Sequence, residues 1–251
     1  MPSRSLVPVS VAIIARDEAE RIGAALKSVA WADEILVLDS GSSDQTCAIA
    51  AGAGARVVVE PWRGYGAMKN RAAELCQHDR VLSLDADERV DPDLAAAIRA
   101  VPADPPAVAW RVRRRNHVGG RVIRHWPWAW DRQIRLYDRR RARFAAAAVH
   151  ESVVADGPVA DLPGILDHLT YRDWLDGAAR NRRYAELWAA AERIHGRRSR
   201  WIDRRIRPSV AFWRHLVVRG HLWSGIDGWR WSRLTADYVR WKYDLLAAEP
   251  H

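Results

Sequence analysis

The sequence predicts an α/β protein with a mainly parallel mixed sheet flanked by helices, and three observations lead to this fold class. In the first hundred residues, short runs rich in Val, Ile and Leu alternate with segments whose apolar residues recur at helical spacing. This alternation is typical of a parallel sheet with helices on both faces. The chain has 251 residues, 49% of them hydrophobic, which is enough to fill such a core. Acidic residues follow two predicted strands, at the edge where open α/β sheets bind ligands.

The elements of the first hundred residues follow from their local patterns. The predicted strands are short apolar runs, and they cover Val9–Ala15, Glu34–Leu38, Arg56–Val59 and Arg80–Leu84. The first helix has Ile22, Leu26 and Val29 on one face. The predicted helices cover Glu18–Val29, Ser43–Ala51, Gly66–Cys76 and Asp93–Val101.

The later residues predict a change of architecture. Ala107–Arg115 has the pattern of a further strand, and the segment after it, with Gly-Gly, Pro and several Trp, predicts loops and an antiparallel extension. Asp173–Ile194 predicts a long helix, and Pro208–Leu246 predicts two helices broken near the segment SGIDG. We find no internal repeat and no low-complexity linker.

Charge and tryptophan are concentrated in the second part of the chain. Residues 1–100 carry 11 basic and 15 acidic residues, whereas residues 101–251 carry 29 and 16. Of the 14 Trp, 12 lie from Trp110 onward. This composition indicates an anionic partner, which can be a nucleic acid, a phosphate-bearing substrate or an acidic membrane surface.

Cysteine use and the N-terminal sequence indicate the compartment. Cys47 and Cys76 lie in apolar or helix-like stretches with no CxxC spacing, so we expect neither a disulfide framework nor a zinc site. The apolar run near the N-terminus is shorter than a signal peptide or a spanning helix requires. We therefore expect a cytoplasmic protein.

Three carboxylates end the predicted strand Arg80–Leu84. In the stretch VLSLDADERVDP, Asp85, Asp87 and Glu88 directly follow the apolar residues. Two carboxylates one residue apart in such a turn can hold Mg²⁺ or Mn²⁺, and the cation can bridge a diphosphate. A solvated acidic loop is the structural alternative. The chain has no GxGxxG and no GxxxxGK[ST] loop, which argues against a dinucleotide enzyme or a P-loop NTPase.

Asp39 also lies just past a predicted strand. A carboxylate in that place can accept hydrogen bonds from a base or a ribose, and we expect it at the same edge of the sheet as Asp85 and Asp87. Asp44 follows in the same loop, and we expect it to cap the next helix.

Several motifs together resemble a known family. The segments SVAIIARDEAERI, ADEILVLDSGSSDQT, PWRGYGAMKNRA, VLSLDADERV, RLYDRR and VHESV have the order and spacing of family 2 glycosyltransferases with the GT-A fold. They are most similar to the bacterial branch that includes lipopolysaccharide core β-1,4-glucosyltransferases. The resemblance is dense over residues 9–100 and continues more weakly to about Tyr184. It implies a GT-A catalytic domain over 1–170, with a donor-binding half 1–100 and an acceptor-side half 101–170, and a helical extension over 171–251.

The resemblance implies a donor pocket at the sheet edge. Asp39 is expected to contact the nucleotide base or ribose, and Ala15, Arg16 and Glu18 to border the same pocket. Lys69 and Asn70 are expected to approach the donor from a helix start, and Arg135 to reach a phosphate. Each of the last three has a surface position as its alternative.

It also implies a divalent cation. Asp85 and Asp87 match the DXD motif of this family, with Asp87 expected on the metal and Asp85 nearer the ribose or sugar. His168 is placed where several GT-A enzymes supply a late histidine to the metal or diphosphate. A hydrogen-bonded core histidine is the alternative for that residue.

An inverting transfer also needs a base to take the proton of the acceptor hydroxyl. Glu151, with His150 beside it, matches the His-Glu of this branch and is our candidate, and Asp131 is the reserve. A surface turn is the structural alternative for the His-Glu pair.

The C-terminal segment mixes Trp and Leu with Arg and Lys. Such helices can lie in a membrane interface, with Trp at headgroup depth and arginines on anionic lipid. Packing onto the catalytic domain or onto a second subunit, as in a homodimer, is the alternative. We therefore expect a peripheral protein on the inner face of the cytoplasmic membrane.

The expected activity is the transfer of a sugar, glucose from UDP-glucose, with inversion onto a lipopolysaccharide core or a related envelope glycan. A nucleic-acid-binding protein is the main rival, but no helix-turn-helix, zinc-finger, RRM or KH pattern supports it. A nucleotidyltransferase would use the same aspartates, but the chain has no basic, glycine-rich N-terminal loop.

Overall fold

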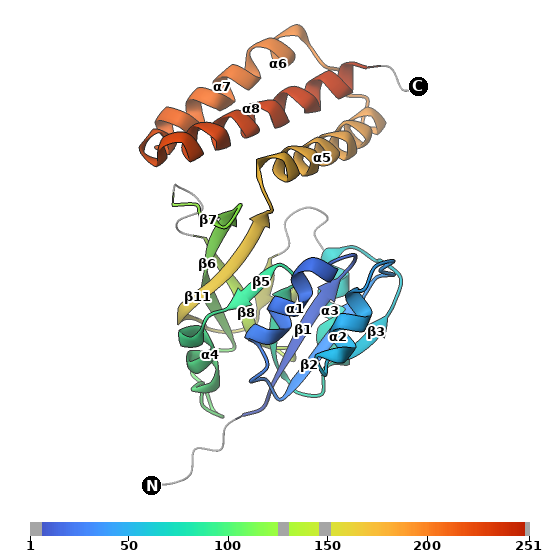
Figure 1. The fold of residues 1–251 in the computed structure, drawn as a ribbon, viewed down its shortest axis with the longest axis vertical. Helices are drawn as coiled ribbons and strands as arrows, with labels where there is room; N and C mark the ends of the chain where they lie inside the picture. The colour runs from blue at the N-terminus through green and yellow to red at the C-terminus, as the bar shows by residue number, and fades with distance from the viewer. Residues whose placement is uncertain (1–6, 125–130, 146–151, 249–251) are drawn as a thin grey trace. The chain divides into compact units, whose positions relative to one another are not determined.

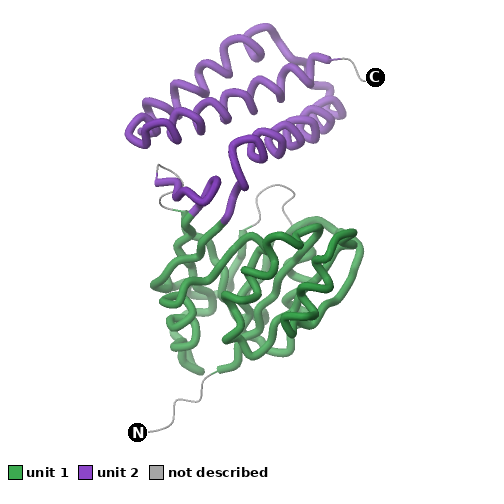
Figure 2. The backbone as a smooth tube through the Cα atoms, viewed as in Figure 1, with its two compact units in different colours: residues 1–115, 131–168 green, residues 116–130, 169–251 purple. Residues whose placement is uncertain are grey.

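The computed structural model describes residues 7–124, 131–145 and 152–248, and these form two compact units. Unit 1 consists of residues 1–115 and 131–168, and unit 2 of residues 116–130 and 169–251 (Figure 2). The segment 116–130, which the sequence analysis assigned to the catalytic domain 1–170, is grouped with the helical unit.

The first part of unit 1 is a parallel sheet covered by helices (Figure 1). Its strands run in the order β3, β2, β1, β4, and every neighbouring pair among them is parallel. The strands are β1 (Val9–Ala15), β2 (Glu34–Asp39), β3 (Arg56–Val59) and β4 (Arg80–Asp85). The helices are α1 (Ala19–Ser28), α2 (Thr46–Gly52), α3 (Tyr65–Leu75) and α4 (Pro92–Arg99). All eight predicted elements of the first hundred residues are confirmed, with ends that differ by a few residues.

Beyond β4 the sheet continues with antiparallel strands. β8 pairs with β4 and β6 pairs with β8, both antiparallel, and β5 pairs antiparallel with β11 at the edge. These strands are β5 (Glu88–Val90), β6 (Ala109–Val118), β7 (Arg121–Val122), β8 (Arg132–Asp138) and β11 (Val159–Tyr171). A separate pair is made by β9 (Ala142–Phe144) and β10 (Val153–Ala155). The predicted antiparallel extension is therefore confirmed, and the parallel order covers only the first four strands.

The core of unit 1 lies on both faces of the sheet because side chains alternate along each strand. On one face, Val11 and Ile13 pack with Ile22 of α1 and Leu94 of α4. On the other face, Ala12 and Leu38 belong to a cluster that includes Met68 and Ala72 of α3. The strand and helix patterns of the sequence are thus both explained by burial against this one sheet.

Unit 2 contains the β6–β7 turn and a group of helices. The helices are α5 (Trp174–Ile194), α6 (Trp201–Arg205), α7 (Arg207–Trp213) and α8 (Gly225–Ala247). A π-helical segment, Arg214–Val218, continues α7, and a 3₁₀ turn, His221–Ser224, precedes α8. The break predicted near SGIDG lies just before that segment, at Gly220, which has a φ of +70°, and α8 already begins at Gly225. Among the described residues, no helix has both the length and the apolar character that crossing a bilayer requires.

Candidate active site

The strand-end carboxylates lie level with one another at the edge of the parallel sheet. Ala15 of β1 is in register with Asp39 of β2, and Ile14 with Asp85 of β4. Because these strands are parallel, their carboxyl ends open onto one rim. The prediction that Asp39 shares an edge with Asp85 is therefore confirmed.

The side chain of Asp39 holds the loop that follows β2. Its Oδ1 accepts hydrogen bonds from the backbone N–H groups of Gly41 and Ser42 at 2.8 and 2.7 Å, and Ser42 Oγ donates to Oδ2. Gly41 has a φ of +91°, which glycine adopts without the steric cost of a side chain. Asp39 is 1% exposed, so its first effect is to shape the loop at the rim.

Two neighbouring loops are tied together beside Asp39. Asp17 has a φ of +54°, which is rare for a residue other than glycine, and its Oδ1 accepts hydrogen bonds from the backbone N–H and hydroxyl of Ser43 at 2.8 and 3.0 Å. Asp44 accepts from the backbone N–H of Thr46 at 2.9 Å and from that of Ala19 at 3.1 Å. Asp44 therefore contacts the first residues of both α2 and α1, but the N-cap position of α2 is Gln45, so Asp44 holds the helix start from one residue further out than expected.

Asp85 is held from two sides by cations. Lys69 Nζ lies 2.9 Å from its Oδ1, and an Arg135 guanidinium nitrogen lies 2.8 Å from its Oδ2. Burial acts to raise the pKa of Asp85, but the charges of Arg135 and Lys69 outweigh it and hold that pKa well below the usual range. Lys69 and Arg135 are 8% and 5% exposed, so the alternative of a surface position is wrong for both.

Glu88 completes this cluster, although its role was not predicted. It is fully buried, with Oε1 2.5 Å from the Arg135 guanidinium, and its Oε2 accepts the backbone N–H of Asp85 at 3.1 Å. Burial acts to lower the pKa of Arg135, but Glu88 and then Asp85 outweigh it and raise that pKa. The guanidinium is thus fixed in its charged form between two carboxylates.

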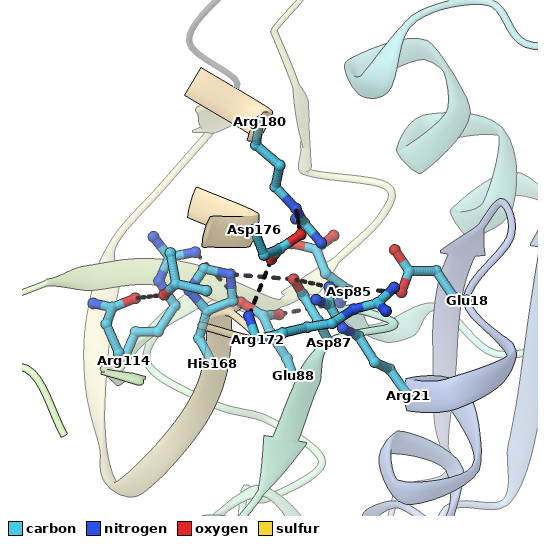
Figure 3. A network of polar contacts seen from close by, with 12 residues as sticks. Glu18, Arg21, Asp85, Asp87, Glu88, Arg114, His168, Arg172, Asp176 and Arg180 are labelled. Carbon is cyan, nitrogen blue, oxygen red and sulfur yellow. Dashed lines mark hydrogen bonds and ion pairs between the residues drawn. The ribbon is translucent and has the colours of Figure 1, made fainter. Parts of the chain in front are cut away.

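Asp87 has different surroundings from Asp85. Its Oδ2 lies 3.6 Å from His168 Nε2 and 3.7 Å from Arg21 Nη1, on opposite sides (Figure 3). It accepts no hydrogen bond from any described residue, although its side chain is only 16% exposed. A carboxylate that is largely removed from water without hydrogen bonds is unfavourable unless a cation compensates it.

These residues fit a hard divalent cation. Carboxylate oxygens with one imidazole nitrogen suit Mg²⁺ or Mn²⁺, and Asp87 and His168 lie 3.6 Å apart, close enough to bind one such ion together. Asp85 has both oxygens engaged by Lys69 and Arg135. Within the described ranges, no three Asp, Glu, His or Cys side chains form a ready-made metal cluster. A cation at this place would therefore take ligands from the substrate as well as from the protein.

Asp131, the reserve base, is bound by neighbours in the antiparallel half. Arg114 lies 2.7 Å from its Oδ2, and Gln133 Nε2 donates to its Oδ1 at 2.9 Å. Arg114 also lies 3.5 Å from Glu88. Asp131 is thereby connected to the cluster around Asp85, with both of its oxygens already engaged.

The other residues predicted for the donor site differ in how strongly their neighbours hold their side chains. The Asn70 amide clamps β9, because it donates to the carbonyl of Phe144 at 2.9 Å and accepts its N–H at 2.8 Å. The Arg16 side chain is 60% exposed, and Glu18 lies 3.7 Å from Arg21. His150 and Glu151 lie outside the described residues. The donor and base roles of all these residues stay predictions.

A cavity of about 210 Å³ opens beside Asp85. Lys69, Arg114, Gln133, Arg135 and Phe144 line it with Asp85. Sequence reasoning missed Arg114, Gln133 and Arg21, and it identified Glu88 only as part of the acidic stretch. The signal that would have found Gln133 is its alternation with Arg135 on one strand, which places both side chains on the same face of the sheet.

Comparison with known proteins identifies the family. The model of glycosyl transferase family 2 matches residues 10–152. The lipopolysaccharide core biosynthesis glycosyltransferase LpsC of Rhizobium meliloti (strain 1021) is 32% identical over 231 residues, which cover 88% of this chain and 85% of LpsC. An uncharacterized glycosyltransferase of Rickettsia bellii (strain RML369-C) is 36% identical over 157 residues, covering 58% of this chain and 52% of that protein.

Solved structures match a smaller part. Mannosyl-3-phosphoglycerate synthase from Rubrobacter xylanophilus is 28% identical with a TM-score of 0.39, covering 44% of this chain and 41% of that one. Glucosyl-3-phosphoglycerate synthase from Mycobacterium tuberculosis, crystallised with Mn²⁺, UDP and glucosyl-3-phosphoglycerate, is 26% identical with a TM-score of 0.36, covering 45% of each chain. The chain thus spans about half or less of these structures and of the Rickettsia relative. The matches in sequence agree with the carboxylates at the ends of the parallel strands. The chain is therefore a glycosyltransferase and belongs to glycosyl transferase family 2.

Proposed function

We propose that this glycosyltransferase moves a sugar from a UDP-sugar, specifically glucose from UDP-glucose, onto a lipopolysaccharide core or a related envelope glycan, with inversion at the anomeric carbon. The acceptor class is supported by the match to LpsC, which extends over most of both chains. The donor, the linkage and the inversion are supported by the resemblance of the motifs around Asp39, Asp85 and Asp87.

The observation that carries the proposal is the contrast between Asp85 and Asp87. Asp85 is locked by Lys69 and Arg135, whereas Asp87 accepts no hydrogen bond from the described residues. Asp87 lies 3.7 Å from Arg21 and 3.6 Å from His168, and these distances leave a largely buried carboxylate without a direct hydrogen bond. Asp87 is therefore assigned to a divalent cation, with His168 next to it.

Each residue of the site has a distinct role in sugar transfer. Asp39 and the loop it holds form the side of the site for the nucleoside, and Lys69 and Arg135 keep Asp85 ionised and oriented toward the sugar. A divalent cation held by Asp87 would neutralise charge on the departing diphosphate. Glu151 takes the proton from the attacking hydroxyl, since both oxygens of Asp131 are engaged by Arg114 and Gln133.

A transfer assay tests this assignment. Purified protein is incubated with radiolabelled UDP-glucose and lipopolysaccharide truncated within its core, and UDP-galactose and UDP-N-acetylglucosamine serve as competing donors. We expect glucose transfer that requires Mg²⁺ or Mn²⁺. Glu151→Gln should stop transfer while UDP affinity stays unchanged, and normal turnover by this variant would remove Glu151 from the role of base.

We also propose that unit 2 associates with an anionic membrane surface. Its segment Trp201–Trp229 exposes a series of large apolar side chains, which we call the apolar ridge: Trp201, Ile202, Ile206, Val210, Trp213, Val217, Val218, Leu222, Trp223, Ile226 and Trp229. From Ile206 to Val217 these residues recur every three or four positions, as on one face of a helix. An exposed apolar surface of this size on a soluble protein marks a binding surface.

The charge of the segment supports lipid as the partner of the ridge. The segment contains five Arg and two Asp, and Trp with Arg is typical of helices that lie in the headgroup region of anionic bilayers. An acceptor anchored in lipid would be presented at this surface. Association of two copies through the ridge is the other outcome, which the oligomeric state in solution would reveal.

A further inference from the structure

A second cavity lies wholly within unit 2, and nothing in the donor site accounts for it. Its volume is about 180 Å³, and Arg121, Ile123, Arg124, Trp174, Trp223 and Asp227 are among the residues that line it. These residues come from β7 and the segment after it, from the first turn of α5, and from the 3₁₀ turn together with the start of α8. Three chain segments that are distant in sequence therefore form one hollow.

The aromatic wall on the α5 side is held in place by packing. Trp174 meets Trp231 edge to face, with ring centroids 6.0 Å apart, and Trp231 is 6% exposed and also contacts Tyr171 at 5.9 Å. Val118 and Ile123 belong to the same small core. The Trp174 indole is thus a fixed surface.

The opposite wall is set by a close approach of backbone. A Cβ on Gly228 would lie 1.8 Å from the carbonyl oxygen of His221, so only glycine lets α8 pack against the 3₁₀ turn. His221 is fully buried, with Nδ1 3.2 Å from Ser232 Oγ. This packing fixes the turn that carries Trp223, whose side chain is 90% exposed.

The cavity has an excess of positive charge. Asp227 Oδ2 lies 3.1 Å from Arg121, and its Oδ1 lies 3.9 Å from Arg230. Arg124 is exposed at the rim and forms no ion pair with any residue that the structure describes. One guanidinium thus remains available to an anion, and guanidinium groups bind carboxylate or phosphate in a bidentate manner.

We propose that this cavity binds one anionic sugar unit of the acceptor glycan. Indole faces pack against the C–H surface of a pyranose ring, and Arg124 and Arg121 pair with a carboxylate or phosphate on that ring or its neighbour. The volume is below the range of about 300–1,000 Å³ typical of sites for drug-sized ligands, so it suits a single ring. The inference rests on the proposed function, because it takes its ligand from the acceptor of that reaction.

The test uses the full chain and a soluble probe. Deacylated lipopolysaccharide core oligosaccharide is titrated into wild-type protein and into Trp223→Ala and Arg124→Ala, beside a dephosphorylated and carboxyl-reduced form of the same oligosaccharide. Tyr184→Ala and Arg198→Ala are matched controls, since both residues are exposed in unit 2 but belong neither to the cavity nor to the apolar ridge. UDP is titrated into each variant separately.

We expect Trp223→Ala and Arg124→Ala each to weaken oligosaccharide binding by about tenfold or more, the cost of losing an interaction to a charged or stacked group. Both controls should bind as wild type does, and UDP affinity should be unchanged. In transfer assays, KM for the acceptor should rise with little change in kcat. The reduced oligosaccharide should bind weakly and should not distinguish Arg124→Ala from wild type.

Three results bear on the inference in other ways. Oligosaccharide affinities equal to those of the controls would overturn it. Loss of binding to phosphatidylglycerol vesicles by Arg124→Ala, with oligosaccharide affinity intact, would show that the cavity takes a lipid phosphate and would also overturn it. Oligosaccharide binding that depends on Trp223, in a protein that does not bind UDP, would support the cavity while contradicting the proposed transfer.

Discussion

The two units of the protein differ in what they bury and what they expose. Unit 1 buries charge: Asp85, Glu88 and Arg135 form a network in which Glu88 is fully enclosed. Unit 2 exposes apolar surface, with the eleven side chains of the apolar ridge between Trp201 and Trp229. Neither feature is what stability alone favours, because buried ion pairs are often no better than apolar packing and exposed Trp side chains contribute little.

The contrast indicates that each unit has a different partner. The buried charges of unit 1 position Asp85 and leave Asp87 for a cation and a diphosphate. The exposed surface of unit 2 is suited to lipid and to a glycan.

The largest effect on stability is expected from Arg135→Leu. This change leaves the carboxylates of Asp85 and Glu88 close together without their shared cation, and such a loss costs about 3–5 kcal/mol. Urea unfolding of the purified variant measures it. Arg140→Leu is the control, because the Arg140 side chain is 67% exposed and its pairs with Asp138 and Asp79 are screened by water and should contribute little to stability. Equal effects of the two changes would contradict a buried network in unit 1.

A smaller effect on stability but a large effect on membrane binding is expected from Val210→Ser combined with Trp213→Ser. Both side chains are more than half exposed, so the free energy of unfolding should change by about 0.5 kcal/mol or less. Binding to phosphatidylglycerol vesicles in a flotation assay should fall by about tenfold or more. Leu175→Ser with Leu187→Ser removes comparable exposed apolar surface from α5 and should leave vesicle binding intact.

A third effect concerns the pH dependence of the stability of unit 2. Burial, followed by the charges of Arg219 and the neighbouring His221, lowers the pKa of His215 to about 4. In the unfolded chain this histidine is protonated near pH 6.5, whereas in the folded chain it is protonated only near pH 4. The unfolded state therefore binds more protons between these pH values, and the stability of the folded state falls as pH decreases from about 6.5 to about 4. The slope is at most about 1.4 kcal/mol per pH unit. His215→Gln should flatten the fall in melting temperature between pH 7 and pH 5, and an unchanged slope would assign it to other groups.

Most of the first hundred residues could be predicted from sequence because local pattern and burial agree there. The apolar runs of β1 and β4 are buried on both faces, and the Ile22 and Leu26 spacing of α1 packs on the sheet as predicted. The placement of Asp39 and Asp85 at one edge of the sheet followed from the predicted parallel strands alone. Asp39 and Asp85 are in parallel register with β1, which needed no knowledge of side-chain contacts.

The rest of the site depended on contacts between segments distant in sequence. Arg114 and Gln133 meet Asp131 through an antiparallel pairing whose register shifts at Trp110 and Arg111, and no local pattern encodes that shift. Glu88 was noticed as part of an acidic stretch, but its burial against Arg135 depends on a residue 47 positions away. The fixed geometry of the unit 2 cavity likewise depends on Gly228 packing against His221. The SGIDG segment predicted a break between helices but not this contact.

Calorimetric titration of UDP into the full chain, with Mn²⁺ and with EDTA, tests the central claim most directly. The variants are Asp87→Ala and, as a control, Asp104→Ala, which removes an exposed carboxylate from a loop outside the site. Metal-dependent binding of UDP by wild type and Asp104→Ala that is lost in Asp87→Ala is the result we predict. Binding of UDP that is indifferent to both EDTA and Asp87→Ala would contradict the assignment of Asp87 to a cation that holds the leaving diphosphate.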